Sequence, residues 1–313
     1  MNLLLRLSLG ALLASPFLPA SARIERVVEK SFTVSAMGHL RIETQRGEIR
    51  VTPSSERVIR VTARQSIRAS TEAGADDLLK ELDLVIEQTG NDVRAAAKYE
   101  KSHGFFAGSW PPVKVDFIVT VPADFTTDLR TSGGSIEVGD MMAKVEARTS
   151  GGRIKLGTLG AGVEARTSGG SITLTEAHGA VKLETSGGNI AVGRVADGPA
   201  HLSTSGGGIR IDAVENLVRA QTSGGSVDAG ITGALREDCT LSTSGGSVRV
   251  AVAKSAAFRL DASTSGGNVN ADGVTLTLDG GHTGRARLSG TANGGGPLLK
   301  LRSSGGNIFV RAN

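Results

Sequence analysis

The chain has 313 residues, and its formal net charge of +4 is small and spread along the sequence. A balance this mild gives no argument for binding nucleic acid, and the single cysteine, Cys239, excludes an internal disulfide. Aromatic residues are few, with eight Phe, one Tyr and one Trp, whereas glycine occurs 43 times.

The first residues are typical of a secretory signal peptide. Arg6 precedes an apolar run, and the sequence Ala20-Ser21-Ala22 fits a cleavage site. The apolar run is too short and too interrupted by proline to span a bilayer. We therefore expect residues 1–22 to be removed after Ala22, which would make the mature chain periplasmic or secreted and not membrane-spanning.

Residues 23–127 predict an N-terminal coil and a capping region. A worn repeat surrounds Gly47, and an acidic start followed by apolar residues at helical spacing predicts a short amphipathic helix at Asp76–Leu84. Alternation of apolar and polar residues predicts strands in the remainder. These strands are Val58–Ala63, Leu84–Gln88, Val93–Tyr99 and Val113–Val121.

One segment of this region concentrates the scarce aromatic residues. Phe105, Phe106 and Trp110 lie in a stretch rich in Gly and Pro, which predicts a loop. Our hypothesis is that their rings form a contact surface for an envelope glycan, lipid or protein. The alternative, that the rings pack over the first coil as the core of the cap, is the commoner situation for aromatic residues.

Residues 128–272 are dominated by a short repeat. Thr-Ser-Gly-Gly occurs eight times, mostly every 18 residues, and Ser303 begins a ninth, altered copy. A period this short leaves no room for a helix in each repeat and is typical of a stacked solenoid. The eight copies begin at Thr131, Thr149, Thr167, Thr185, Thr204, Thr222, Thr243 and Thr264.

Alternating apolar residues flank each copy, so each repeat predicts two short strands that meet at a Gly-Gly corner. The Thr falls on the inward parity, where its hydroxyl can bond backbone groups of the corner. We expect the glycines to supply a positive φ at the corner. Cys239 also falls on an inward position, which favours a small buried hydrophobe over a reactive thiol.

The outward positions before each Thr form columns of charge. Arg130, Arg148 and Arg166 lie one repeat apart, each two residues after an acid. Opposite charges on neighbouring strands stabilise a sheet mildly. We interpret these columns as a solvated ion-pair ladder in preference to an anion-binding stripe.

Residues 273–313 predict a loop or hairpin excursion followed by a last coil. The whole pattern predicts an all-β chain, a parallel β-helix with about nine or more coils of 18 to 21 residues and an irregular N-terminal β cap containing one short helix. Open ends of such a stack invite association, so the chain is expected to be a monomer or to associate end to end.

The sequence resembles the bacterial putative-adhesin family of secreted β-strand-repeat proteins, which is similar also to head GIN domain proteins. The residues that carry the resemblance are VTVPAD at Val119–Asp124 and LRTSGGSIEV at Leu129–Val138, and it extends roughly from Phe32 to Val310. The resemblance implies a β-helix at the cell envelope. It implies no catalytic residues, because the family has no agreed site.

No motif for catalysis, metal binding or a cofactor stands out. The five histidines are scattered, and the outward column that runs from Glu137 to Asn270 is too varied for the acid cluster of a polysaccharide-cleaving β-helix or the threonine ladder of an ice-binding one. We therefore predict a non-enzymatic adhesin or scaffold that binds a surface ligand and needs no cofactor. A glycan-active β-helix enzyme and a self-assembling structural rod are the alternatives.

Overall fold

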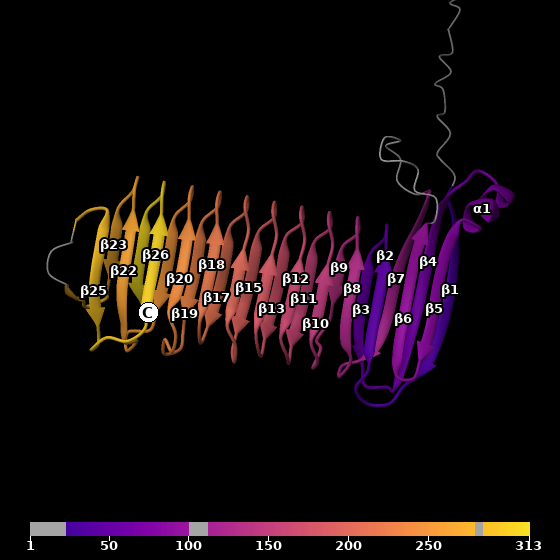
Figure 1. Cartoon of the computed structure of the whole chain (residues 1–313), viewed down its shortest axis with the longest axis horizontal. Coiled ribbons are helices and arrows are strands. Elements are labelled where there is room, and N and C mark those ends of the chain that lie inside the picture. The colour runs from indigo at the N-terminus through magenta and orange to yellow at the C-terminus, as the bar shows by residue number, and fades with distance from the viewer. Residues whose placement is uncertain (1–22, 100–111, 279–283) are drawn as a thin grey trace, which may run out of the picture.

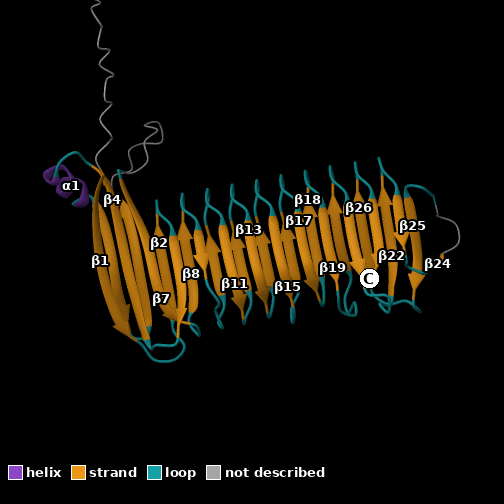
Figure 2. Cartoon of the chain, turned by 180° about the vertical axis from the view of Figure 1, so that it is seen from behind, coloured by secondary structure: helices purple, strands orange, loops and turns teal. Residues whose placement is uncertain are grey.

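The computed structural model describes residues 23–99, 112–278 and 284–313, which form a long two-sided rod with one short helix at its N-terminal end (Figure 1). The rod consists of two sheets, and each coil contributes one strand to each of them (Figure 2). We call the 13-stranded sheet, which begins at β1, sheet A and the 14-stranded sheet, which ends at β5, sheet B. The predicted parallel β-helix is confirmed, since consecutive coils pair in parallel.

The N-terminal part combines coil strands with antiparallel strands. β1 and β4 extend sheet A, and β5 extends sheet B, by antiparallel pairing. No helix in the described ranges is long and apolar enough to cross a membrane. The elements are β1 (Arg23–Thr33), β2 (His39–Thr44), β3 (Ile49–Ser54), β4 (Val58–Arg68), α1 (Glu72–Leu79), β5 (Leu82–Thr89), β6 (Asp92–Tyr99) and β7 (Val113–Pro122).

The repeats form the middle of the rod. Their even-numbered strands lie in sheet B and their odd-numbered strands in sheet A. The strands are β8 (Thr126–Thr131), β9 (Ile136–Val138), β10 (Val145–Arg148), β11 (Ile154–Leu159), β12 (Val163–Arg166), β13 (Ile172–Ala177), β14 (Val181–Glu184), β15 (Ile190–Val195), β16 (Ala200–Ser203), β17 (Ile209–Val214), β18 (Val218–Thr222), β19 (Val227–Ile231), β20 (Cys239–Thr243) and β21 (Val248–Val252).

The C-terminal part adds two coils and a hairpin. β25 pairs antiparallel with both β22 and β24, so it covers the last coil on the side of sheet B. The strands are β22 (Phe258–Thr264), β23 (Val269–Asp272), β24 (Thr277–Leu278), β25 (Arg287–Ala292), β26 (Leu298–Ser303) and β27 (Ile308–Ala312).

The core is a stack of identical inward positions. Ile154 of β11 lies directly between Ile136 and Ile172 of the neighbouring coils, and all three side chains are buried. The predicted parity therefore holds through the repeats. Cys239 is buried at an inward position as predicted, and burial raises the pKa of its thiol, which keeps the sulfur protonated.

The threonines of the repeat form a ladder of hydroxyls along the edge of the core. Thr185 Oγ1 donates to the carbonyl of Gly170 in the previous coil at 2.8 Å and accepts from the N–H of Gly188 at 3.3 Å. The same pair of bonds recurs from Thr131 to Thr264, and Ser303 makes it in the altered copy. The hydroxyl thus satisfies two backbone groups at a place where no strand pairing reaches them.

The expectation that the repeat glycines adopt positive φ is wrong for all nine copies from Thr131 to Ser303, and only Gly47 of the worn repeat has a positive φ, of 148°. The second glycine is required by close approach instead. A Cβ on Gly152 would overlap the carbonyl of Gly134 in the coil before, whereas a Cβ on Gly151 would meet nothing nearer than 3.6 Å. The backbones of successive corners are therefore in direct contact at the second glycine of each Gly-Gly pair.

Stacking order departs from chain order at both ends of the rod. The coil made by β2 and β3 lies between the coil of β6 and β7 and that of β8 and β9. In the same way, β26 and β27 lie between β20 and β21 on one side and β22 and β23 on the other. One coil at each end is thus inserted between two others.

The predicted helix Asp76–Leu84 is wrong at both ends, because α1 spans Glu72–Leu79. Thr71 caps its N-terminus by accepting from the N–H of Gly74 at 3.1 Å, which starts the helix one turn earlier. Leu82, which has the spacing of the helix's apolar face, begins β5.

We predict that Thr185→Val lowers the free energy of unfolding by about 1–3 kcal/mol, because two half-buried backbone groups lose their partner while the side-chain volume is kept. Thr185→Ser is the matched control, since it keeps the hydroxyl and should cost about 1 kcal/mol for the lost methyl. Urea denaturation measures both. A valine variant as stable as the serine variant would contradict the role of the hydroxyl.

Tyr99 is the only tyrosine, so its titration can be followed alone. Burial and the hydrogen bond to Glu81 raise the pKa of Tyr99 to about 12. The folded state therefore holds this proton more tightly than the unfolded state. Stability from this group should be complete below about pH 10 and decline as pH rises toward 12. Phenolate absorbance should titrate near pH 12 in the folded chain, and a value near 10 would contradict the burial.

Candidate functional site

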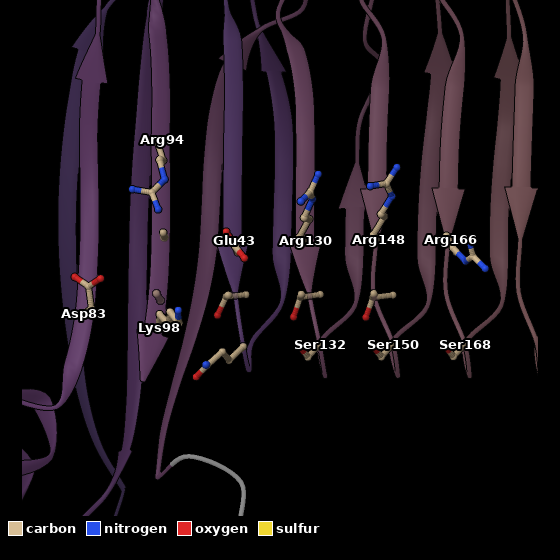
Figure 3. A pocket seen from close by; sticks show the side chains of 16 residues that line it. Glu43, Asp83, Arg94, Lys98, Arg130, Ser132, Arg148, Ser150, Arg166 and Ser168 are labelled. Carbon is tan, nitrogen blue, oxygen red and sulfur yellow. The ribbon is translucent and has the colours of Figure 1, made fainter. Parts of the chain in front are cut away.

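A groove with a volume of about 400 Å³ crosses the outer face of sheet B at its N-terminal end (Figure 3). It extends over β6, β2, β8, β10 and the end of β12. It is lined by Glu43, Thr44, Gln45, Asp83, Arg94, Ala96, Ala97, Lys98, Arg130, Thr131, Ser132, Arg148, Thr149, Ser150, Arg166 and Ser168.

Three arginines in one outward column form the long side of the groove. Arg130, Arg148 and Arg166 are direct partners on β8, β10 and β12. Neighbouring strands lie about 4.8 Å apart, so the column presents a guanidinium at that interval. Ser132, Ser150 and Ser168 follow at the corners and lie in a second row beside the arginines (Figure 3).

Carboxylates fix the positions of the guanidiniums. Asp128, which is buried, accepts two hydrogen bonds of 3.0 Å from Arg130. Arg148 donates to Glu164 at 3.2 Å. These contacts confirm the predicted ion pairs, but they do not test the preference for a ladder over an anion-binding stripe. The arginine side chains nevertheless remain between 40% and 67% exposed, so each keeps N–H donors that face solvent.

One carboxyl of the ladder, that of Glu146, has a lowered pKa. The Lys144 ammonium donates to Glu146 at 2.6 Å, which lowers the pKa of that carboxyl against the opposing effect of burial. The charges of Lys144 and Arg148 lower it further. Glu146 therefore stays ionised beside Arg148, at 3.7 Å from its guanidinium.

The floor of the groove is made by the inserted coil at the N-terminal end. Glu43 of β2 lies between Arg130 and Ala96 of β6 in the same column, so the arginine row ends there. Ala96 and Ala97 of β6 have small side chains, and they are flanked on the same strand by Arg94 and Lys98. Five basic and two acidic side chains line the groove, which makes it basic.

The groove presents mainly cationic donors and hydroxyls. None of its lining residues is a histidine or a cysteine. Within the described ranges, no group of three or more His, Cys, Asp or Glu side chains could hold a metal ion. The arrangement can donate several charge-assisted hydrogen bonds to an extended anionic or hydroxyl-rich ligand.

The candidate ligand residues from the sequence, Phe105, Phe106 and Trp110, lie outside the described residues. Of the other aromatic residues nearby, Tyr99 and Phe117 are buried in the core. The groove itself was missed in the sequence. Its arginine column was visible, but the arrival of β2 and β6 beside that column was not, because nothing local indicates which coil stacks on which.

This architecture defines a two-sheet β-solenoid domain with a basic groove on one face. The chain belongs to the Toastrack DUF4097 family, whose model matches residues 37–311. The resemblance to the putative-adhesin family is thereby confirmed. A search of the curated proteins finds no match.

The solved structures that match this chain share little sequence with it. A putative adhesin from Parabacteroides distasonis is 13% identical over 91% of this chain and 97% of its own, with a TM-score of 0.49. A putative lipid binding protein from the same species is 12% identical over 92% and 97%, with a TM-score of 0.42. A putative cell adhesion protein from Clostridium sporogenes is 10% identical over 93% and 100%, with a TM-score of 0.24. With TM-scores below 0.5, these likenesses carry no argument about this chain.

Proposed function

We propose that this chain is a non-enzymatic binding and scaffold protein of the cell envelope or exterior, and that its basic groove on sheet B binds an acidic envelope glycan. The observation that carries the proposal is the row of Arg130, Arg148 and Arg166, held in place by carboxylates yet exposed. Preoriented guanidiniums lose little conformational entropy on binding and match carboxylate and phosphate groups.

The groove also offers neutral contacts of the kind a sugar requires. The serine row supplies hydroxyls that can either donate or accept hydrogen bonds. The neighbouring arginine guanidiniums can only donate them. The rigid coil spacing of about 4.8 Å repeats these contacts along the rod, which favours an extended polymer over a small molecule.

We predict that Arg148→Gln weakens binding of soluble peptidoglycan fragments by about tenfold or more, because one charge-assisted hydrogen bond contributes about 1.5–3 kcal/mol. Calorimetric titration of the mature chain measures this. Binding by the unaltered chain should also weaken as salt is added.

Arg60→Gln is the matched control, since Arg60 is an exposed arginine with one acidic partner, Glu56, and lies on sheet A. It should bind like the unaltered chain. Equal losses in the two variants, or no binding of any acidic glycan by the unaltered chain, would contradict a ligand site in the groove.

The enzymatic alternative predicts a different outcome with the same reagents. A glycan-active β-helix would release new reducing ends or unsaturated sugars from an envelope polysaccharide. We expect purified chain to release neither, and their appearance would overturn the non-enzymatic assignment.

The aromatic segment is proposed as a second contact. Replacing Phe105, Phe106 and Trp110 together by Ser should weaken ligand binding while leaving the melting temperature unchanged. A lower melting temperature with full ligand binding would instead indicate that these rings stabilise the cap.

The third alternative, a rod that assembles end to end, has less support. The hairpin of β24 and β25 covers β22 at the C-terminal end of sheet B. The two-residue strand β24 thereby replaces β22 as the edge of sheet B, and very short edge strands reduce strand-to-strand association. A monomer in sedimentation at high concentration is the expected result.

A further inference from the structure

The outer face of sheet A carries a second hollow, of about 430 Å³, near the C-terminal end of the rod. Its floor is formed by Gly230 and Ala251, which are direct partners on β19 and β21. Since the strands stack in the order β17, β19, β21, β27, the lining residues Asp212 and Arg311 lie at opposite ends of this floor. Arg249 and Phe309 flank it.

Phe309 has an unusual position for an aromatic residue of this chain. The other described Phe and Tyr side chains belong to the core or pack against it, whereas Phe309 lies on an outward position. Its ring lies beneath the guanidinium of Arg249, with 5.7 Å from Cζ to the ring centroid. This contact, worth about 0.5–1 kcal/mol at an exposed site, orients the ring but leaves it only half-buried.

Three arginines and two aspartates line the hollow, and Asp272 of β23 lies directly opposite Arg311 outside it. Arg210 donates to Asp212 at 2.8 Å and Arg249 to Asp228 at 3.2 Å. Both aspartates keep acceptor sites for further donors. Arg311 has no ion-pair or hydrogen-bond partner among the residues that the structure describes, so its donors face the hollow unoccupied.

The inserted C-terminal coil creates this combination. In chain order, Asn270 would follow Arg249 in the outward column. Because β27 enters between β21 and β23, Phe309 stands there instead, with Arg311 beside Ala251. The hollow therefore combines a flat apolar ring, paired aspartates and a free arginine around a small floor, which is the pattern of a small-ligand site with few convergent polar groups.

We propose that this hollow binds one pyranose unit that carries a carboxylate, as in a hexuronate-containing glycan. The C–H face of the sugar packs on Phe309, its hydroxyls donate to Asp212 and Asp228, and its carboxylate accepts from Arg311. The proposal does not rest on the arginine groove, which lies on the other sheet.

The test uses the mature chain, a short oligoglucuronate, and an oligoglucose of the same linkage as the neutral probe. The unaltered chain should bind the oligoglucuronate about tenfold or more tightly than the oligoglucose in calorimetric titration. Phe309→Leu should weaken binding of both probes about tenfold, because leucine keeps an apolar side chain but removes the flat ring.

Arg311→Gln should remove the preference for the acidic probe, whereas Arg311→Lys should keep most of it. Arg60→Gln, on β4 at the other end of sheet A and outside both hollows, should change neither affinity. Since Arg311 is exposed and has no partner among the described residues, its variants should have the melting temperature of the unaltered chain. If Phe309→Leu lowers stability, the Arg311 variants therefore still test the proposal. Absence of binding by the unaltered chain, or unchanged preference in Arg311→Gln, would overturn the proposal.

Discussion

The rod depends on the contact between the Thr-Gly-Gly corner of each coil and the corner of the coil before it. At that corner, a threonine hydroxyl bonds the carbonyl of the second glycine of the previous repeat, as Thr149 does with Gly134 at 2.8 Å. The backbones approach so closely there that a Cβ on the second glycine would overlap the neighbouring chain. One coil alone buries too little apolar surface to offset its ordering entropy, so stability comes from this repeated stacking.

A fixed corner leaves the outward positions free to vary. Inward residues must match the coils on either side, but outward residues meet solvent, and only their register is imposed by the stacking. This is why three arginines can stand in one row on sheet B while the corresponding column of sheet A is varied. Both candidate sites lie where a coil is inserted out of chain order, at β2 in one case and at β27 in the other.

The sequence predicted what depends on local periodicity. The inward threonines, the buried Cys239 and the arginine column followed from a period of two and a constant repeat. Two features required tertiary information. The reason for the glycines was misjudged, because close approach to another coil leaves the same sequence signal as positive φ. The sequence did not indicate the positions of the inserted coils. The copy that begins at Ser303 resembles every other copy, and nothing in its residues shows which coils it stacks against.

The helix illustrates a different limit. Leu78, Leu79 and Leu82 share helical spacing, yet Leu82 lies in a strand that pairs with Tyr99. Thr71 was the better signal for the start of the helix, since its side chain caps the first turn. Apolar spacing over so few residues fits both structures.

The most direct test of this account compares two neighbouring glycines in one corner. Gly152→Ala should lower the free energy of unfolding by at least about 2 kcal/mol, because the new Cβ would overlap the backbone of Gly134. Gly151→Ala should change it by no more than about 1 kcal/mol, because its Cβ would meet ordinary contacts. Urea denaturation of the two variants measures the difference, and equal effects would contradict close stacking at the second glycine.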